Sequence, residues 1–415
     1  MPFNIGLSGL NAAQADLQTT GHNVSNAGTT GFKRSRAEFG DVFAQTFGGI
    51  SQTAIGSGTR LQAVTQQFSQ GRTEFTENGL DLAINGEGFF VLNDQGNTVY
   101  TRAGEFQVDR DGFLVNNQGQ QLQGYPPQNA SAADPEFNTG QLNDIRLQTG
   151  DADPQATGEI EALVNLRSDA ENLDPALFDA ADPDTYNFST ALTVYDSLGT
   201  ARDANLFFVK TADLEWQAHA RVEAGVDAAG DPVAFDAGPF DLSFNNSGTL
   251  EEPTTFNLTT PDFPNGAAGL DTELDFGGTT QFGGDFAVND LSQDGFASGR
   301  LTGVDIDDSG VVFARFTNGQ SRVLGQVAMA NFTNPQGLEK LGNNNWAETF
   351  AAGDPVLAAP GTSNLGTIQA GALEAANVDI AQELVNLITA QRNFQANAQT
   401  ISTADQITQT IINIR

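Results

Sequence analysis

Both ends of this chain carry apolar residues that recur every seven positions. Such a repeat predicts a helix with one apolar seam, and that seam must be buried against another helix. We therefore expect the two terminal helices to pack against each other and against other copies of the chain. The same periodicity also fits a helical hairpin within one globular domain. The predicted seam residues are Leu10, Leu17 and Val24 at the N-terminal end and Ile380, Leu384, Leu387, Phe394 and Ile401 at the C-terminal end.

Between these ends the pattern changes to short runs of β-branched and aromatic residues separated by turn residues. Runs of this kind bounded by Asp, Asn and Gly are typical of antiparallel hairpins. We expect hairpins over residues 82–101 with a turn at 93–96, over 106–115 with a turn at 111–112, over 191–209 with a turn at 196–199, and over 311–330 with a turn at 317–320.

A chain of 415 residues exceeds one ordinary core, so several domains are expected. The predicted fold class is α+β and multidomain, with paired N- and C-terminal coiled-coil-like helices and nested, mainly antiparallel β-domains. The path is nested because the two helical ends must meet. The predicted parts are a terminal helical domain (1–28 and 372–415), an irregular connecting arm (29–72 and 360–371), an inner β-domain (73–158 and 297–359) and an outer β-domain (159–296).

The composition of the chain excludes several kinds of partner and site. The formal net charge is −34, which makes nucleic acid a poor partner. The chain has no cysteine, so disulfides, thiolate zinc sites and cysteine nucleophiles are excluded. We find neither a Sec-type leader nor a run of eighteen apolar residues, and we expect no membrane insertion.

Sites for chemistry are poorly supported by the sequence. His22 and His219 are the only histidines, which leaves little material for a catalytic relay or a histidine metal site. Residues 305–310 (DIDDSG) begin like a calcium loop, but Phe316 stands where a bidentate Glu is needed, so a turn is predicted. We predict no catalytic residue, no metal and no cofactor.

Short motifs follow one another along both ends of the chain: 8–13 (SGLNAA), 23–36 (NVSNAGTTGFKRSR), 80–90 (LDLAINGEGFF), 101–106 (TRAGEF), 331–338 (NFTNPQGL), 377–379 (NVD), 383–385 (ELV) and 391–394 (QRNF). In this order, these segments resemble bacterial flagellar rod and hook proteins. The resemblance covers residues 1–125, 190–210 and 300–415 and is thin over 215–295. A large middle insert that includes residues 193–199 (TVYDSLG) favours the hook over the shorter rod proteins.

The resemblance implies a structural, non-enzymatic subunit that polymerises into a hollow, bendable tube. It also implies export through the flagellar type III apparatus without a cleaved Sec signal, and an extracellular location in the flagellum. Its expected partners are further copies of itself, the flagellar rod, the hook cap and the hook-filament junction proteins. In that tube the subunit would act as a universal joint that passes motor torque to the filament. The alternatives are a distal rod protein and a secreted β-rich adhesin or binding module.

Positive charge is concentrated just after the first helix, in a chain that is otherwise acidic. Lys33, Arg34 and Arg36 lie within four positions of one another. A solvated turn would account for them, but we favour inter-subunit charge contacts with acidic neighbours.

The resemblance also implies that the terminal helices line a central channel. Uncharged amides such as Gln391 and Gln395 would let an unfolded chain pass without sticking. We predict that Gln391→Leu or Gln395→Leu slows filament growth, because an apolar lumen would bind the passing chain. Filament length against time in cells carrying each variant measures this, and unchanged growth would count against an amide-lined channel.

Overall fold

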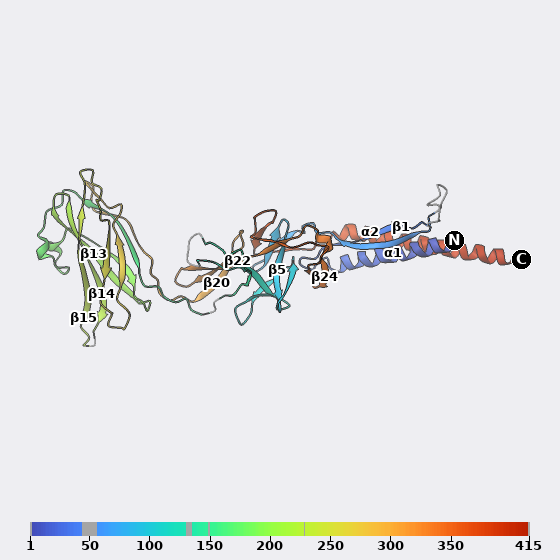
Figure 1. Cartoon of the computed structure of the whole chain (residues 1–415), viewed down its shortest axis with the longest axis horizontal. Helices are drawn as coiled ribbons and strands as arrows, with labels where there is room; N and C mark the ends of the chain where they lie inside the picture. The colour runs from blue at the N-terminus through green and yellow to red at the C-terminus, as the bar shows by residue number, and fades with distance from the viewer. Residues whose placement is uncertain (1, 44–55, 130–134, 148–149, 228, 414–415) are drawn as a thin grey trace. The chain divides into compact units, whose positions relative to one another are not determined.

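The computed structural model describes residues 2–43, 56–129, 135–147, 150–227 and 229–413 (Figure 1). The chain forms two compact units. The terminal unit comprises Met1–Thr149, Gly303–Arg315 and Ser321–Arg415, and the central unit comprises Gly150–Thr302 and Phe316–Gln320. The chain thus leaves the terminal unit, builds the central unit and returns, which confirms the nested path.

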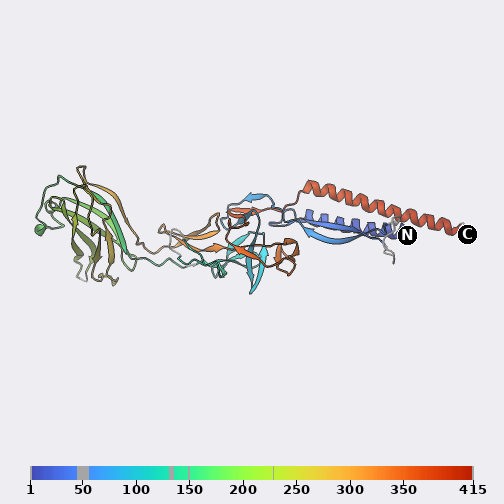
Figure 2. The ribbon, with the colours of Figure 1, turned by 45° about the horizontal axis from the view of Figure 1, so that its top comes forward.

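Two helices form the ends of the chain, and they lie side by side (Figure 1, Figure 2). They are α1 (Pro2–Ser25) and α2 (Ile380–Asn413). Their pairing confirms the prediction that the two ends pack together. Within the described part of the chain, neither helix is long and apolar enough to cross a membrane.

The second helix begins later than the predicted boundary at residue 372. Asp379 caps its first turn, with its Oδ1 accepting hydrogen bonds from the backbone amides of Ala381 at 2.9 Å and Gln382 at 3.2 Å. The preceding residues Ala372–Glu374 form strand β28 instead, because they pair antiparallel with β3 (Thr73–Phe75). Sheet pairing has therefore overridden the helical pattern at this boundary.

The arm expected to be irregular over 29–72 contains a regular two-stranded antiparallel ribbon. Its strands are β1 (Ser35–Asp41) and β2 (Thr59–Gln66), and both contact α1. Glu38 joins the two strands, since its Oε1 accepts hydrogen bonds from Arg36 and from the Thr65 hydroxyl. The glycine-rich composition concealed this ribbon, and residues 44–55 of the arm lie outside the described residues.

The β-part of the terminal unit is one extended sheet system of short strands. Its main path runs β20-β21-β22-β9-β5-β6-β25-β24, and β4 pairs separately with β27. Aromatic rings fill its core, with Phe89, Tyr100, Phe332 and Trp346 in edge-to-face contact. The strands are β4 (Leu82–Asn85), β5 (Phe89–Asp94), β6 (Asn97–Thr101), β7 (Phe106–Val108), β8 (Leu114–Asn116), β9 (Gln121–Tyr125), β10 (Asn143–Asp144), β20 (Leu301–Ile306), β21 (Val311–Phe316), β22 (Ser321–Val327), β23 (Met329–Asn331), β24 (Glu339–Gly342), β25 (Asn345–Ala347), β26 (Val356–Ala358) and β27 (Thr367–Ala370), with a 3₁₀ turn η3 at Pro335–Gly337.

The central unit consists of two sheets that share one core. The residues of strand β11 alternate between exposed and buried, so one face of its sheet lies against the core and the other faces solvent. Trp216, Phe208, Phe276 and Leu274 are fully buried between the sheets. One sheet is β12 (Phe188–Tyr195), β13 (Ala201–Ala212), β14 (Glu215–Val226) and β15 (Pro232–Ser243); the other is β11 (Glu159–Arg167), β16 (Thr255–Thr259), β17 (Asp271–Asp275), β18 (Thr280–Phe282) and β19 (Ala287–Gln293), with 3₁₀ turns η1 (Pro175–Leu177) and η2 (Pro183–Thr185) before β12.

The hairpins predicted from the sequence are confirmed. They are the pairs β5–β6, β7–β8, β12–β13 and β21–β22, each antiparallel. The predicted turn in the calcium-loop-like segment is also confirmed, because Asp307 Oδ1 accepts hydrogen bonds from the backbone amides of Ser309 and Val311. That carboxylate is therefore engaged in closing the turn between β20 and β21.

A buried ion cluster joins three distant parts of the terminal unit. The carboxylate of Glu374 lies 2.6 Å from the Lys33 ammonium and 3.1 Å from the Arg102 guanidinium. It also accepts a hydrogen bond from the backbone amide of Gly71. Burial lowers the pKa of Lys33, and the neighbouring Glu374 carboxylate opposes that shift. One carboxylate of the returning chain thus satisfies a charge from the arm and a charge from the β-core.

We predict that Glu374→Ala destabilises the terminal unit by about 3–5 kcal/mol, because it leaves two buried cations without an opposite charge. Denaturant unfolding of the whole chain measures this loss. The matched control is Glu339→Ala, which removes an exposed carboxylate from the same unit and should leave the unfolding midpoint unchanged. Equal midpoints for the two variants would contradict a stabilising role for the cluster.

Candidate assembly surface

The contact between the two terminal helices is made largely by small residues. On α1, Gly6, Ala13 and Thr20 are buried and spaced by seven, and Ala390 of α2 is fully buried. A Cβ atom built on Gly6 would lie 2.9 Å from Cγ1 of Ile401, so the helices approach closely there. Sequence analysis missed this seam because it followed the large apolar residues, although the small residues repeat with the same period.

The large apolar residues of the helices are left at the surface. Of the eight predicted seam residues, Leu10, Leu17, Val24, Leu387 and Ile401 are half-buried, while Ile380, Leu384 and Phe394 are exposed. The exposed fractions of Ile380 and Leu384 are 53% and 46%. Exposed apolar patches of this kind mark interaction surfaces. Further exposed apolar residues on the two helices are Phe3, Ile5, Leu7, Val385, Ile388, Ile407 and Ile412.

The end of α1, the start of the arm and the start of α2 are joined by a polar network. Asn23 is buried, and its side chain exchanges two hydrogen bonds with the backbone of Ser35, at 2.8 and 2.9 Å. Its amide also donates to Glu383 of α2 at 3.3 Å. Arg34 bonds Glu383 through its guanidinium at 3.4 Å and Asn377 through its backbone amide at 2.7 Å. This network fixes where the helix pair leaves the arm.

Comparison with known families finds four matching models. They are a flagella basal body rod protein model over residues 3–33, a flagellar hook protein FlgE/F/G D1 domain model over 83–160, a flagellar basal body protein FlaE D2 domain model over 165–296, and a flagellar basal body rod FlgEFG protein C-terminal model over 369–414. Together they span both units of the fold.

Full-length relatives decide between the rod and the hook. The chain is 39% identical over 418 residues to the flagellar hook protein FlgE of Salmonella typhimurium, covering all of both chains. The identity to the flagellar hook protein FlgE of Escherichia coli is 38% over the same length, again covering all of both. This chain belongs to the flagellar hook protein family. Hook proteins are structural subunits and not enzymes, as the sequence predicts.

A solved hook protein shares the fold of this chain. The crystal structure of Helicobacter pylori flagellar hook protein FlgE2 matches with a TM-score of 0.55 and 16% identity, covering 73% of this chain and all of that one. At this identity the likeness concerns the fold alone.

The three basic residues predicted to contact neighbouring hook subunits have different surroundings within the chain. Lys33 is 1% exposed and paired with Glu374, so its charge is already used inside the fold. Arg34 is partly exposed and bonds Glu383, whereas Arg36 is exposed and bonds Glu38 of the same strand. Arg34 and Arg36 remain accessible for contacts between subunits, which stay a prediction.

Acidic groups oppose each other where the helices of this hook-family chain meet the arm. Burial raises the pKa of the Asp16 carboxyl, and the nearby Glu383 carboxylate raises it further. An acid whose pKa is higher in the folded state disfavours folding at neutral pH. This penalty shrinks as the pH falls through the folded pKa and is absent below the unfolded pKa, near 3.8.

We predict that Asp16→Asn stabilises the helix pair at pH 7, because it removes a partly buried charge beside Glu383. The gain should decline as the pH is lowered and vanish below about pH 4, where Asp16 itself is protonated. Thermal unfolding followed by circular dichroism at several pH values measures this. A gain that is independent of pH would contradict the electrostatic cause.

Proposed function

We propose that the chain polymerises through its terminal helices into the hollow tube of the flagellar hook, outside the cell. In that tube it acts as a flexible joint that passes torque from the motor to the filament. The observation that carries the proposal is a helix pair that buries small residues where the helices meet while several of its large apolar residues stay exposed. Ile380, Leu384 and Ile388 form one such exposed group on α2.

The energetics of the helix pair favour assembly over a solitary subunit. Burying one Leu or Ile side chain contributes about 1.5–3 kcal/mol. Contact with neighbouring helix pairs would bury several such side chains at once. The seven-residue repeats predict buried apolar side chains, and the helix pair of one chain buries them only in part. Assembly would therefore bury the apolar side chains that remain exposed.

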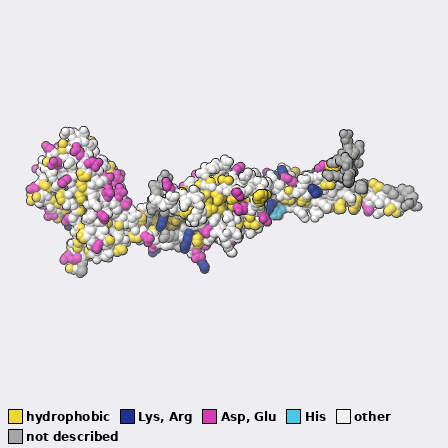
Figure 3. All heavy atoms as spheres, viewed as in Figure 1, with side chains coloured by type: hydrophobic (Ala, Val, Ile, Leu, Met, Phe, Trp, Pro, Cys, Tyr) yellow, Lys and Arg dark blue, Asp and Glu magenta, His cyan; other side chains and the backbone are white. Residues whose placement is uncertain are grey.

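The acidic surface of the central unit suits a different kind of contact. On the face drawn in Figure 3, acidic side chains are spread over this unit. Contacts between such surfaces are polar and hydrated, and they exchange at small cost. We infer that central units slide against one another when the hook bends, while the apolar helices hold the tube together.

The position of a hook within the flagellum suggests the remaining partners of this chain. A hook polymer must meet the rod at one end and the hook-filament junction proteins at the other, and it grows beneath a hook cap. We propose export by the flagellar type III apparatus, to which a chain without cysteine presents no disulfide that would resist unfolding.

We predict that Leu384→Glu raises the concentration needed for polymer formation at least tenfold, since it replaces an exposed apolar contact by a charge. About 1.4 kcal/mol of lost contact energy corresponds to this factor. The control is Gln382→Glu, which adds the same charge at an exposed polar position two residues away. Sedimentation and electron microscopy of the purified full-length chains measure polymer formation.

Deleting residues 380–413 gives a second, independent test of the same proposal. Polymers should be lost while the β-rich parts still unfold cooperatively, because their cores contain no residue from α2. Curved tubes are expected from the intact chain, in contrast to the straight polymer of a rod protein. Polymers that persist without α2 would overturn the assembly role of the helices.

A further inference from the structure

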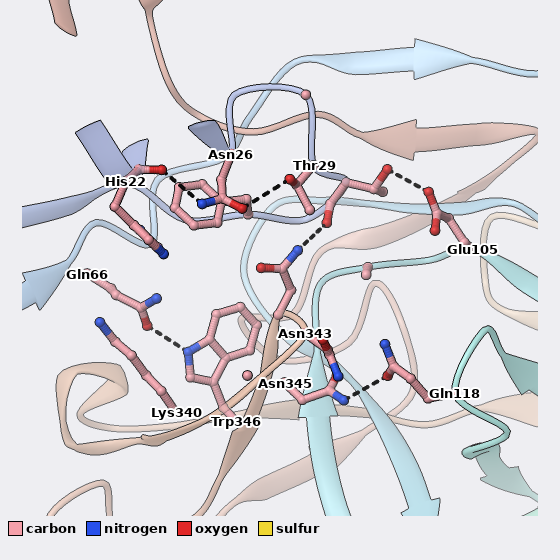
Figure 4. Close-up of a pocket in the computed structure, with 16 residues that line it drawn as sticks. His22, Asn26, Thr29, Gln66, Glu105, Gln118, Lys340, Asn343, Asn345 and Trp346 are labelled. Atoms are coloured by element: carbon pink, nitrogen blue, oxygen red, sulfur yellow. Dashed lines mark hydrogen bonds between the residues drawn. The ribbon is translucent and has the colours of Figure 1, made fainter. Parts of the chain in front are cut away.

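A polar cleft of about 590 Å³ lies in the terminal unit, beyond the end of α1 (Figure 4). Its walls come from the turn after α1, from Gln66 at the end of β2, and from the β24–β25 hairpin. Most of the side chains that line it are amides or hydroxyls, which can both donate and accept hydrogen bonds. A cleft of this size and chemistry can hold a short stretch of polypeptide.

The walls of the cleft are held in place by hydrogen bonds from the β24–β25 hairpin. The Trp346 indole N–H donates to Gln66 Oε1 at 2.6 Å, and the Asn344 amide donates to the Thr30 carbonyl at 2.8 Å. Asn343 and Asn344 both adopt positive φ, at 51° and 60°, as the two central residues of a tight hairpin turn do, and asparagine is favoured in that conformation.

One cation in this cleft lacks a partner in the described part of the chain. The chain has three lysines, and two of them are used internally. Lys33 pairs with Glu374, and the Lys210 ammonium donates to the carbonyls of Ser168 and Ala170. Lys340 makes no such bond among the described residues, and partial burial lowers its pKa. Figure 4 shows its side chain reaching along the same side of the cleft as His22 and Gln66.

The cleft also contains one acidic residue, and it is already engaged. Glu105 accepts hydrogen bonds from the Thr30 hydroxyl at 2.7 Å and from the Asn117 amide at 3.0 Å. Among the described residues, no ion pair joins Glu105 to Lys340. Lys340 is itself exposed, so a carboxylate from elsewhere can reach its ammonium and would complete the site with a charge-assisted hydrogen bond.

We propose that this cleft receives an acidic, extended segment of a neighbouring copy of the chain, with a carboxylate of that copy bound to Lys340. The amides of the cleft would bond the backbone of the segment. A second copy is the occupant favoured by charge, since the chain has 52 acidic against 18 basic residues and any neighbour presents many carboxylates. This inference rests on the proposed polymer, but it names a contact made by a polar cleft and not by the apolar residues of the helices.

Zero-length carbodiimide coupling tests the contact directly, because it joins an ammonium to a carboxylate only when the two touch. Polymers assembled from equal amounts of isotope-labelled and unlabelled full-length chains should yield peptides that link Lys340 to an Asp or Glu of the other chain. Monomers at low concentration should not. Polymers in which Lys340 is unlinked, or linked only within one chain, would overturn the inference and leave the proposed function intact.

Variants of the same lysine give a quantitative measure. Lys340→Glu should raise the concentration needed for polymer formation about tenfold, as expected for a lost charge-assisted hydrogen bond and new repulsion. Lys340→Arg should stay near wild type, because the charge is kept. The control Arg110→Glu reverses a charge that is 91% exposed in the same unit, and should have little effect. Equal effects of Lys340→Glu and Arg110→Glu would show a general charge effect and overturn the contact.

Wild-type chains that never sediment would overturn the proposed function and this inference together.

Discussion

The close approach of the two terminal helices is the constraint on which the rest of this molecule depends. Small residues such as Gly6, Ala13 and Ala390 are buried there, so the helices approach closely while several of their large apolar side chains stay exposed. Burial of apolar surface drives association. The pair therefore forms within one chain and still offers an apolar surface, which is the property that a polymerising subunit needs.

This pairing requires the chain to return to its starting point, and the polar clusters show how the return is fixed. Glu374 and Glu383, both in the returning segment, meet Lys33 and Arg34 near the N-terminus. Burying the first pair is costly unless its polar atoms have further partners. Arg102 and Gly71 both donate to Glu374, and Lys33 also donates to the carbonyl of Ser69. The clusters thus specify one arrangement of the three segments, whereas apolar contacts alone would tolerate several.

Much of the architecture could be predicted from local sequence. The hairpins were predictable because turns such as residues 196–199 place Asp and Gly where the backbone requires them; Asp196 Oδ1 accepts two amide hydrogen bonds and Gly199 has a φ of 78°. The ribbon formed by β1 and β2 was not predictable, since its glycines and polar residues resemble a loop until α1 provides a surface for it. For the same reason, the start of α2 was placed too early: strand β3 captures residues 372–374.

The sequence by itself determined the paired helices, the β-rich middle, the nested order and the family, because periodicity, turn chemistry and motifs are local or simply ordered along the chain. Only the tertiary structure decided which helical residues face inward, that Lys33 is buried with Glu374, and that Lys340 stands in a cleft. The physical reason is that burial and charge pairing join residues hundreds of positions apart. The distance between two such residues in space cannot be read from their separation along the chain.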